Sequence, residues 1–400
     1  MTFTSALDRA APSERHAYMA RLHTSVDAVR DIWLRFEMNG VCTAYQRYDW
    51  VDLVVRRLLP RGTAELLVVE LVCPTTLEPV MLFPLVRHTY PGFREITWLS
   101  CDVCDYATPL LVRPMAFSED HADAVWAAIR SVLPPADRIR IDAIPADLAS
   151  HVQNPLSRLA AAAVSDVTAY GIALGGPTES LLKRLCKPAF SNKVGRKWRQ
   201  LEKLGTVSFQ EVETREDRDR IFAVLVEQRH RRFRELGRFD LLANEKYRSF
   251  YRDAACQRTR DGAVHIFGLK VDDEWIATFY VLVHGGCAHA ILLTMDQGKW
   301  KRMAPGLLII ARTMEWANRH GLDYFDLSVG NRYYKEQIGA GSRPLLSIDE
   351  SLTQKGVLVA RLHQCVKRVR IWAKRQPRLV ACVKGYRSRL RIILTALTKG

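Results

Sequence analysis

Two apolar runs joined by a glycine pair constrain the fold of this chain more than any other feature. Residues 275–283 and 287–294 are rich in β-branched and aromatic side chains, and only His284-Gly285-Gly286 separates them. Tight turns between antiparallel strands need a positive φ, which glycine adopts without steric cost. Another apolar run, 263–271, precedes them across the short turn Asp272-Asp273. The sequence therefore predicts three strands that are antiparallel neighbours.

A helix and a fourth strand follow these three. Pro305 stands where a first helical turn would begin, apolar residues recur at helical spacing after it, and Gly321 ends the pattern. The next apolar strand ends in Phe325-Asp326-Leu327. This order predicts a strand, loop, helix and strand crossover.

The start of that helix is a candidate anion site. Backbone N–H groups at a helix N-terminus are free to bind an anionic group, and cations lie just upstream. One such dipole interaction contributes only about 0.3–1 kcal/mol, so several groups must act together. The segment fits either an ordinary connection or a pyrophosphate cradle. The residues of that cradle would be Lys301, Arg302, Pro305, Gly306 and Leu307.

Asp326 is the most telling polar residue of the crossover. A carboxylate within an apolar strand costs free energy unless it is paired or used. It could accept hydrogen bonds from nearby backbone N–H groups, or it could serve as a general base whose pKa burial raises. Tyr334 and Lys335, a few residues later, could donate to a substrate carbonyl or phosphate, or form a surface pair.

The rest of the chain shows a similar alternation of helices and strands. The expected helices before the hairpins cover 13–37, 46–59, 118–132, 179–204 with a break at Pro188, 214–235 and 247–258. The expected strands cover 64–72, 79–86, 95–99, 138–144, 167–174 and 207–212, with a seam at 145–163. The loop 104–110 is either a tight connection or a substrate-facing segment. The dense cations of the helix at 179–204 form either a solvated face or a phosphate-steering rim.

Length, charge and cysteine content limit the class of protein. The 400 residues suit two domains, and the net charge of +16 attracts phosphate-bearing partners. Nine scattered cysteines argue for a reducing compartment, and the lone CxxC pair, Cys101 and Cys104, predicts no metal site. The absence of a signal-like start or a long apolar run predicts a cytoplasmic protein.

The last 40 residues contain many cations and no acids. After Pro377, apolar residues recur at helical spacing among arginines and lysines, which predicts a basic amphipathic helix over 378–400. This helix could pack on the body of the protein or lie on an anionic membrane surface.

Several motifs together resemble one known family. The segments Ala304-Pro305-Gly306-Leu307-Leu308, Glu315-Trp316-Ala317, Gly321, Phe325-Asp326-Leu327, Gly330 and Tyr334-Lys335 are similar to the BioF-type (CelD-like) acetyltransferase domain of the GNAT superfamily. The resemblance covers roughly 179–341 and includes His230, Arg232 and Gly237. The chain departs from the usual GNAT pyrophosphate motif at Met303 and Leu308.

The resemblance implies an α+β, GNAT-like fold with a mixed, mostly antiparallel sheet and flanking helices. It also implies two GNAT-like halves, distantly similar to the FemAB peptidyltransferases. The expected division is an N-terminal half at 1–160, the acyltransferase domain at 161–350 and a basic helical tail at 351–400.

The implied function is transfer of an acetyl or other acyl group from acyl-CoA to an amine, without a metal, in cell-envelope or exopolysaccharide metabolism. Asp326 or His230 would be the base, with Tyr334 and Lys335 as further catalytic candidates. Two alternatives stay open. A FemAB-like enzyme would take an aminoacyl group from charged tRNA, and a non-catalytic protein with a degenerate GNAT fold would recognise a partner.

Overall fold

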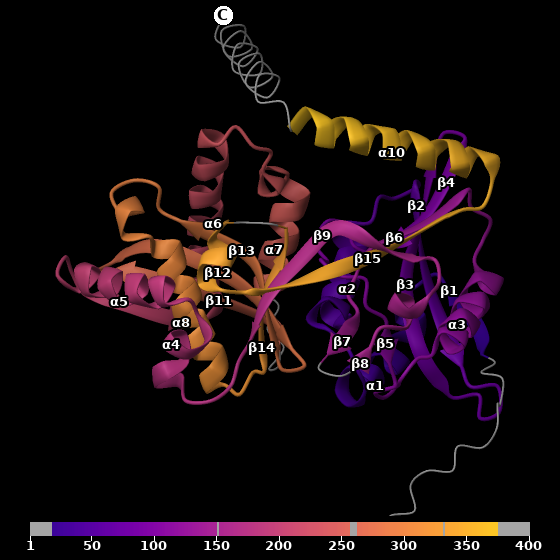
Figure 1. The fold of residues 1–400 in the computed structure, drawn as a ribbon, viewed down its shortest axis with the longest axis horizontal. Coiled ribbons are helices and arrows are strands. Elements are labelled where there is room, and N and C mark those ends of the chain that lie inside the picture. Colours follow the sequence, from indigo (N-terminus) through magenta and orange to yellow (C-terminus); the bar gives the residue numbers. More distant parts are fainter. Residues whose placement is uncertain (1–17, 150–151, 257–261, 331–332, 375–400) are drawn as a thin grey trace, which may run out of the picture.

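A computed structural model describes residues 18–149, 152–256, 262–330 and 333–374 (Figure 1). The chain has an α+β fold built on a mixed, mostly antiparallel sheet with helices on its faces. The main sheet of the described residues has 13 strands and runs without interruption through both halves of the molecule. The strand order is β1-β2-β3-β4-β6-β15-β9-β14-β13-β12-β11-β10, and β5 pairs with β3 outside this path.

The first half supplies one edge of the sheet. Its helices are α1 (Arg30–Asn39), α2 (Tyr48–Arg57) and α3 (Glu119–Val132). Its strands are β1 (Met19–His23), β2 (Ala64–Val72), β3 (Pro79–Tyr90), β4 (Phe93–Trp98), β5 (Leu110–Leu111) and β6 (Arg138–Ile144). The short strands β7 (Asp147–Ala149) and β8 (Val152–Gln153) form a separate pair.

The second half supplies the other edge. Its helices are α4 (Leu181–Leu185), α5 (Pro188–Glu202), α6 (Arg215–Glu235), α7 (Glu245–Cys256), α8 (Pro305–Arg319) and α9 (Tyr333–Ile338). Its strands are β10 (Val207–Glu211), β11 (Val264–Val271), β12 (Glu274–His284), β13 (Cys287–Met295) and β14 (Tyr324–Val329).

The two halves repeat one order of elements. A strand, two helices, three antiparallel strands, a helix and a parallel strand occur as β1-α1-α2-β2-β3-β4-α3-β6 and again as β10-α6-α7-β11-β12-β13-α8-β14. In each half the strands on either side of the last helix pair in parallel, β4 with β6 and β13 with β14. The halves are therefore two copies of one architecture.

Two long strands cross between the halves in opposite exchange. Strand β9 (Ala162–Ala173) follows the first half but pairs with β14 of the second. Strand β15 (Gly341–Ser351) follows the second half but pairs with β6 of the first, and β9 and β15 also pair with each other. Figure 1 shows both strands running across the middle of the molecule. The division at residue 160 stays a prediction, because one sheet joins both parts.

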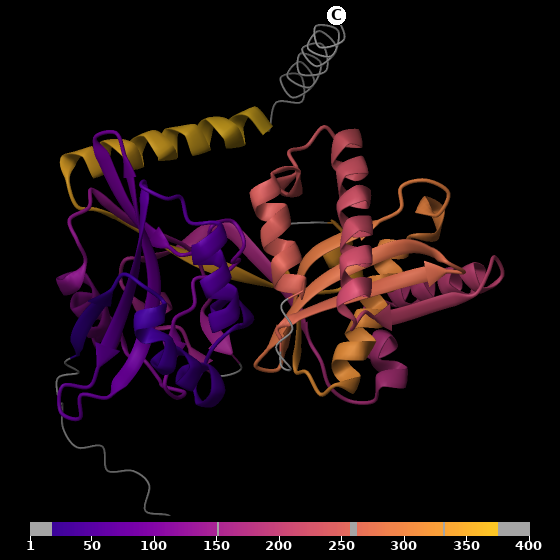
Figure 2. The same cartoon turned by 180° about the vertical axis from the view of Figure 1, so that it is seen from behind.

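Three apolar cores hold the helices to this sheet. Helices α1, α2, α6 and α7 share one core that spans both halves, with Trp50 of α2 against Phe250 of α7 at 4.9 Å between ring centroids. Helix α3 packs in a second core on the first half, and α5 and α8 in a third on the second half. Figures 1 and 2 show these helix layers from opposite sides.

Most expected elements agree with the structure, including both hairpins around Asp272-Asp273 and Gly285-Gly286. The helix expected over 13–37 is wrong in its first part, because Met19–His23 forms the edge strand β1 along β2. The ladder with β2 there outweighs the weak helical preference of the segment. Strand β15 was not expected from the sequence.

Helix α10 (Gln354–Lys374) follows β15 and runs across one end of the first half (Figures 1 and 2). It contacts β15, its His363 lies 2.8 Å from Arg138 of β6, and most of its described residues are exposed. The amphipathic helix expected over 378–400 lies outside the described residues. Within the described part of the chain, no helix combines the length and apolarity needed to cross a membrane.

Candidate active site

A cavity of about 500 Å³ opens where β13 and β14 part. The two strands pair in parallel over only three positions, from Cys287 opposite Tyr324 to His289 opposite Asp326. Beyond these positions the cavity separates them, with Ala290, Leu293 and Met295 of β13 on one side. The ends of α6 and α8 and the β14–α9 turn complete its wall. We call this space the donor cavity.

The start of α8 forms one wall of the donor cavity. Ala304 precedes the helix in the left-handed region, with φ 54° and ψ 49°, and Pro305 occupies the first helical turn. Gly306 follows against Met295, where an added Cβ would come within 2.4 Å of the methionine methyl carbon. A side chain at this position would displace the end of Met295, and the Gly306 N–H is one of the first-turn donors that a helix cannot satisfy itself.

Cations surround the same cavity. Lys301 reaches it from the turn before α8, and Arg229, Arg232 and Arg238 reach it from the end of α6 and the following loop. Of the residues expected to hold a pyrophosphate, Lys301, Gly306 and Leu307 line the cavity, whereas Arg302 and Pro305 are not among its lining residues. Lys193 of the basic helix α5 and Lys187, which precedes that helix, line an adjoining cavity of about 330 Å³, which shares Leu307 with the donor cavity.

Tyr334 and Lys335 lie on α9 beside the donor cavity and differ in their surroundings. Lys335 is 2% exposed, and its Nζ donates to the carbonyl oxygens of Ser328, Val329 and Gly330 at 2.9, 2.9 and 3.0 Å. The ammonium therefore holds the turn between β14 and α9. Tyr334 is half-buried at the cavity wall.

His230 lies on α6 and does not line the donor cavity, although its neighbours Arg229 and Arg232 do. Its Nδ1 is 2.5 Å from Oδ2 of Asp240, and Arg229 Nε donates to Oδ1 of the same carboxylate at 2.6 Å. Asp240 thus fixes the end of α6. A catalytic role for His230 stays a prediction.

Asp326 is fully buried at the last paired position of β14 and is 1% exposed. Its Oδ1 accepts from the Tyr106 hydroxyl at 3.0 Å and the Ser328 backbone N–H at 2.6 Å. Its Oδ2 lies 3.1 Å from His289 Nδ1. Burial alone would raise the pKa of Asp326, but the hydrogen bonds from His289 and Ser328 hold that pKa below its ordinary value.

Ser328 links Asp326 to a second buried carboxylate. It adopts a left-handed φ of 66°, which is uncommon for a residue other than glycine. Its hydroxyl donates to Asp105 of the first half, and Asp105 also accepts from Tyr45 at 3.1 Å. Burial raises the pKa of Asp105. The loop 104–110 therefore reaches across to β14, and it faces the site through Asp105 and Tyr106.

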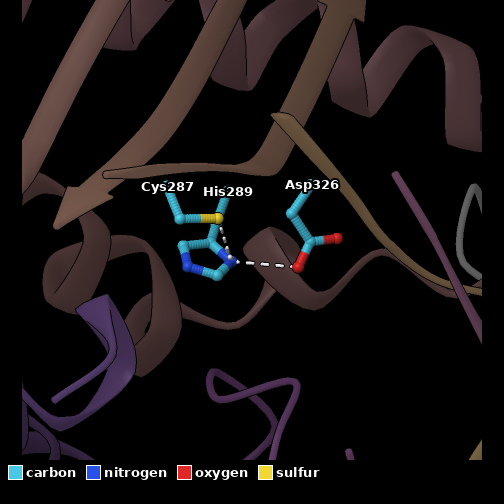
Figure 3. Close-up of side chains that lie close together, drawn as sticks. All are labelled: Cys287, His289 and Asp326. Carbon is cyan, nitrogen blue, oxygen red and sulfur yellow. Dashed lines mark hydrogen bonds and ion pairs between the residues drawn. The ribbon is translucent and has the colours of Figure 1, made fainter. Parts of the chain in front are cut away.

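Cys287 and His289 were not expected as site residues. They lie two residues apart on β13, and Cys287 Sγ is 3.9 Å from His289 Nδ1 (Figure 3). Burial would lower the pKa of His289, but Cys287 and Asp326 raise it to about 10. These side chains face a second cavity of about 330 Å³ that both halves line. The alternation of Cys287-Ala288-His289 in a strand could have indicated that both side chains share one face.

Comparison with known proteins identifies the second half. Residues 189–336 match the model of an acetyltransferase (GNAT) domain family. The chain carries a GNAT domain. This domain includes the donor cavity, with β13, α8, β14 and Tyr334 and Lys335 of α9. The resemblance found in the sequence is thus confirmed at the level of the superfamily.

Solved structures extend the likeness of fold beyond the GNAT domain. FemX has 11% sequence identity and a TM-score of 0.58, over 84% of this chain and 98% of FemX. A conserved protein of unknown function from Bacteroides thetaiotaomicron has 12% identity and a TM-score of 0.50, over 83% of this chain and 99% of that protein. At these identities the likeness concerns the fold alone. No curated protein matches the sequence.

The first half lacks the features that make the GNAT domain suitable for an anion. Helix α3 holds the place that α8 has in the GNAT domain, but Glu119 and Asp120 occupy its first turn. Ser118 caps this helix by accepting from the His121 N–H at 3.2 Å. Two carboxylates at a capped N-terminus repel phosphate. Of the two repeated helices, α8 therefore begins beside cations without an acidic residue in its first turn, whereas α3 begins with two acids.

Proposed function

We propose that this chain is an acyltransferase that binds acyl-CoA in the donor cavity and transfers the acyl group to an amine. The observation that carries the proposal is the open start of α8 beside the parted strands β13 and β14. Gly306, Lys301 and three arginines gather there at the wall of one cavity. Backbone N–H groups and cations in this arrangement suit the pyrophosphate of CoA.

The parted strands suit the reacting end of the donor. Beyond His289, β13 pairs with β12 but not with β14, so the N–H and C=O groups that point away from β12 face the cavity side of the sheet. An N–H there would polarise the thioester carbonyl, and holding both reactants together supplies most of the rate gain. The amine nitrogen attacks the carbonyl carbon and the C–N bond forms. The C–S bond breaks to release thiolate, and the proton that the nitrogen loses passes to water.

The four catalytic candidates have different positions for this reaction. Tyr334 at the cavity wall is the proposed donor of the proton that the thiolate takes up. Lys335 holds the β14–α9 turn through three carbonyl groups, which suits a positioning role. Asp326 and His230, expected as bases, already accept or share hydrogen bonds from several partners, and we propose that they position Ser328 and the end of α6.

A second candidate function rests on charge and fold. The net charge of +16 and the likeness of fold to FemX favour a FemAB-like enzyme that takes an aminoacyl group from charged tRNA. Such a protein would bind tRNA with an affinity that falls steeply with salt, and it would not respond to CoA. A non-catalytic protein would respond to neither donor.

We place the reaction in the cytoplasm, on an amine acceptor of cell-envelope or exopolysaccharide metabolism. Free cysteines at all eight described cysteine positions agree with a reducing compartment. The basic C-terminal region would bring the enzyme to an anionic membrane surface, where acceptors of this kind are assembled.

Calorimetric titration with acetyl-CoA and a longer acyl-CoA, with CoA as the reference, tests the donor. Lys301→Ala should weaken binding by about tenfold or more, because a charge-assisted hydrogen bond contributes about 1.5–3 kcal/mol. Arg302→Ala is the matched control, since this neighbouring exposed cation does not line the cavity. Gly306→Val should weaken binding, because its side chain would push the end of Met295 into the cavity.

Equal effects of the two cation variants would contradict the placement of the donor. An absence of saturable binding by every CoA species would contradict acyl-CoA as the donor. Titration of the same protein with charged tRNA at two salt concentrations would then decide between the FemAB-like enzyme and the non-catalytic protein.

A further inference from the structure

We propose that Cys287, His289 and Asp326 bind a transition-metal ion, and that zinc fits the site best. The site lies where β13 and β14 part, and it goes beyond the proposed transfer reaction, which needs no metal. It also differs from the expectation from the sequence, where the lone pair Cys101 and Cys104 predicted no metal site.

The three donor atoms converge on one point. One ligand atom from each of the three residues lies within 4.8 Å of the other two. Cys287 Sγ is 3.9 Å from His289 Nδ1, which is 3.1 Å from Asp326 Oδ2. Zinc binds such atoms at about 2.0–2.3 Å, so one ion between them needs only small side-chain movements. Figure 3 shows the three side chains facing a common space.

The backbone fixes this arrangement. His289 and Asp326 are opposite each other in the parallel ladder, and Cys287 lies two residues before His289 on the same face of β13. All three donors therefore come from paired strands and not from loops. Sites built on rigid elements hold their geometry without an ordering cost at binding.

The same geometry argues against a nucleophilic cysteine relay. In a Cys-His-acid relay the thiol faces one ring nitrogen and the acid faces the other. Here both the thiol and the carboxylate face Nδ1 of His289. A single N–H on that nitrogen can serve only one of them, whereas a metal ion at the same place binds all three.

Neighbouring groups orient the proposed ligands. Tyr106 and the Ser328 N–H hold Oδ1 of Asp326, which leaves Oδ2 towards His289. Tyr45 packs edge-on against the His289 ring at 5.1 Å between centroids. Such outer hydrogen bonds fix the orientation of metal ligands and raise metal affinity.

The donor set and surroundings indicate the class of metal. Thiolate, imidazole and carboxylate together favour zinc or a similar divalent ion over magnesium or calcium. Three protein ligands leave a fourth position open, and the ligands line the cavity of about 330 Å³ that both halves share. A bound ion would cross-link β13 and β14 at the position where the two strands separate to form the walls of the donor cavity.

Cobalt titration of the full-length protein, stripped with a chelator, tests the site. We expect one Co²⁺ per chain, a thiolate-to-cobalt charge-transfer absorption, and displacement by one equivalent of Zn²⁺. Cys287→Ser should remove this absorption, and Tyr106→Phe should weaken binding by roughly 10–100-fold. Cys365→Ser, which changes an exposed cysteine of α10, is the matched control.

Thermal unfolding of the wild type is a second readout, and it tests the site even if the variants fold poorly. The midpoint of thermal unfolding of the wild type should rise with added Zn²⁺, because an ion that binds only the folded state stabilises it. Absence of stoichiometric binding, or a thiolate band that persists in Cys287→Ser, would overturn the proposal. Because neither readout uses CoA, a failure here is distinguishable from a failure of the donor proposal.

Discussion

Arg138 shows how one buried side chain joins several parts of this fold. Its guanidinium donates to both carboxylate oxygens of Asp349 at 2.7 Å and to Glu95 at 3.2 Å, and it lies 2.8 Å from His363 Nδ1. These partners come from β15, β4 and α10, while Arg138 itself begins β6. The side chains of Arg138 and Glu95 are 2% and 8% exposed, so this pair is shielded from water, whereas Asp349 lies at the surface.

Replacing Arg138 should therefore be costly. Arg138→Met leaves the buried Glu95 without its partner, and removing one member of a buried ion pair typically costs about 3–5 kcal/mol. Arg130→Met is the control, because Arg130 is half exposed and 3.4 Å from Glu350, and such surface pairs contribute about 0–1 kcal/mol. Urea unfolding of both variants measures the difference. Similar losses for the two would contradict a special role of the buried pair.

Single residues of the site could be predicted from the sequence only where a polar residue stands within an apolar segment. Asp326 stands out because a carboxylate within an apolar strand needs partners, and the structure provides Tyr106, Ser328 and His289. The sequence could not name those partners. Tyr106 is 220 residues away and His289 is 37 residues away, and only the pairing of strands brings them together.

At the scale of elements, the corner between β15 and α10 depends on one carboxylate. Asp137 accepts from the Arg94 N–H of β4 and from the Thr353 hydroxyl, both at 2.8 Å. These hydrogen bonds hold the pKa of Asp137 below its ordinary value of 3.8. The ionised form thus ties three elements together.

This pairing predicts a pH dependence. A carboxyl group whose pKa is lower in the folded state stabilises the fold at neutral pH, and this stabilisation is lost as pH falls below about 4. Asp137→Ala should therefore be less stable than the wild type at pH 7, with a gap that narrows towards pH 3. Urea midpoints at both pH values measure the gap. Asp142→Ala, an exposed acid on β6, should show a smaller gap.

Helices and strands could be predicted where the local sequence carries turn residues or an apolar periodicity. They could not be predicted where only pairing with a distant strand makes a segment extended. Glycine turns and alternating apolar residues mark β11, β12 and β13, and Pro305 and Gly321 mark the ends of α8. Strand β15 begins with four exposed residues, 341–344, that include a proline, and therefore shows no buried alternation. Its extended form comes from the ladders with β6 and β9 on either side.

At the scale of the whole molecule, α10 presents an apolar stripe to solvent. Leu358, Leu362, Val369 and Trp372 lie on one side of the helix and are 57–70% exposed. The 50 residues from Ser351 onwards contain 13 lysines and arginines and no aspartate or glutamate. An apolar stripe within so basic a region suits an anionic lipid surface, where each cation contributes about 1 kcal/mol.

Vesicle co-sedimentation tests this surface. The full chain should bind vesicles that contain phosphatidylglycerol and should leave neutral phosphatidylcholine vesicles free. Leu362→Ser with Trp372→Ser should reduce the bound fraction several-fold, because both side chains lie on the exposed stripe. Met38→Ser, at an exposed residue near the end of α1, is the control. Undiminished binding of the double variant would contradict the role of α10.

The sequence predicted the number of halves but not their connection. Length indicated two domains, and two similar halves were implied by the family resemblance; the repeated order of elements is seen only in the structure. Dividing the sequence at residue 160 assigns β15 to the second half. Its pairing with β6 of the first half could not be predicted, because the paired residues are about 200 positions apart. Non-local pairing of this kind leaves no periodic signal in either strand.

The crossing of β9 and β15 also bears on the history of the chain. Two like units that each lend their last strand to the other have the geometry of a strand-exchanged homodimer. Joining two such subunits end to end would give this order of elements in one polypeptide. The fused copies then need not remain identical. In this chain one copy has a helix start with cations beside it at α8, whereas the other has acidic residues in the first turn of α3.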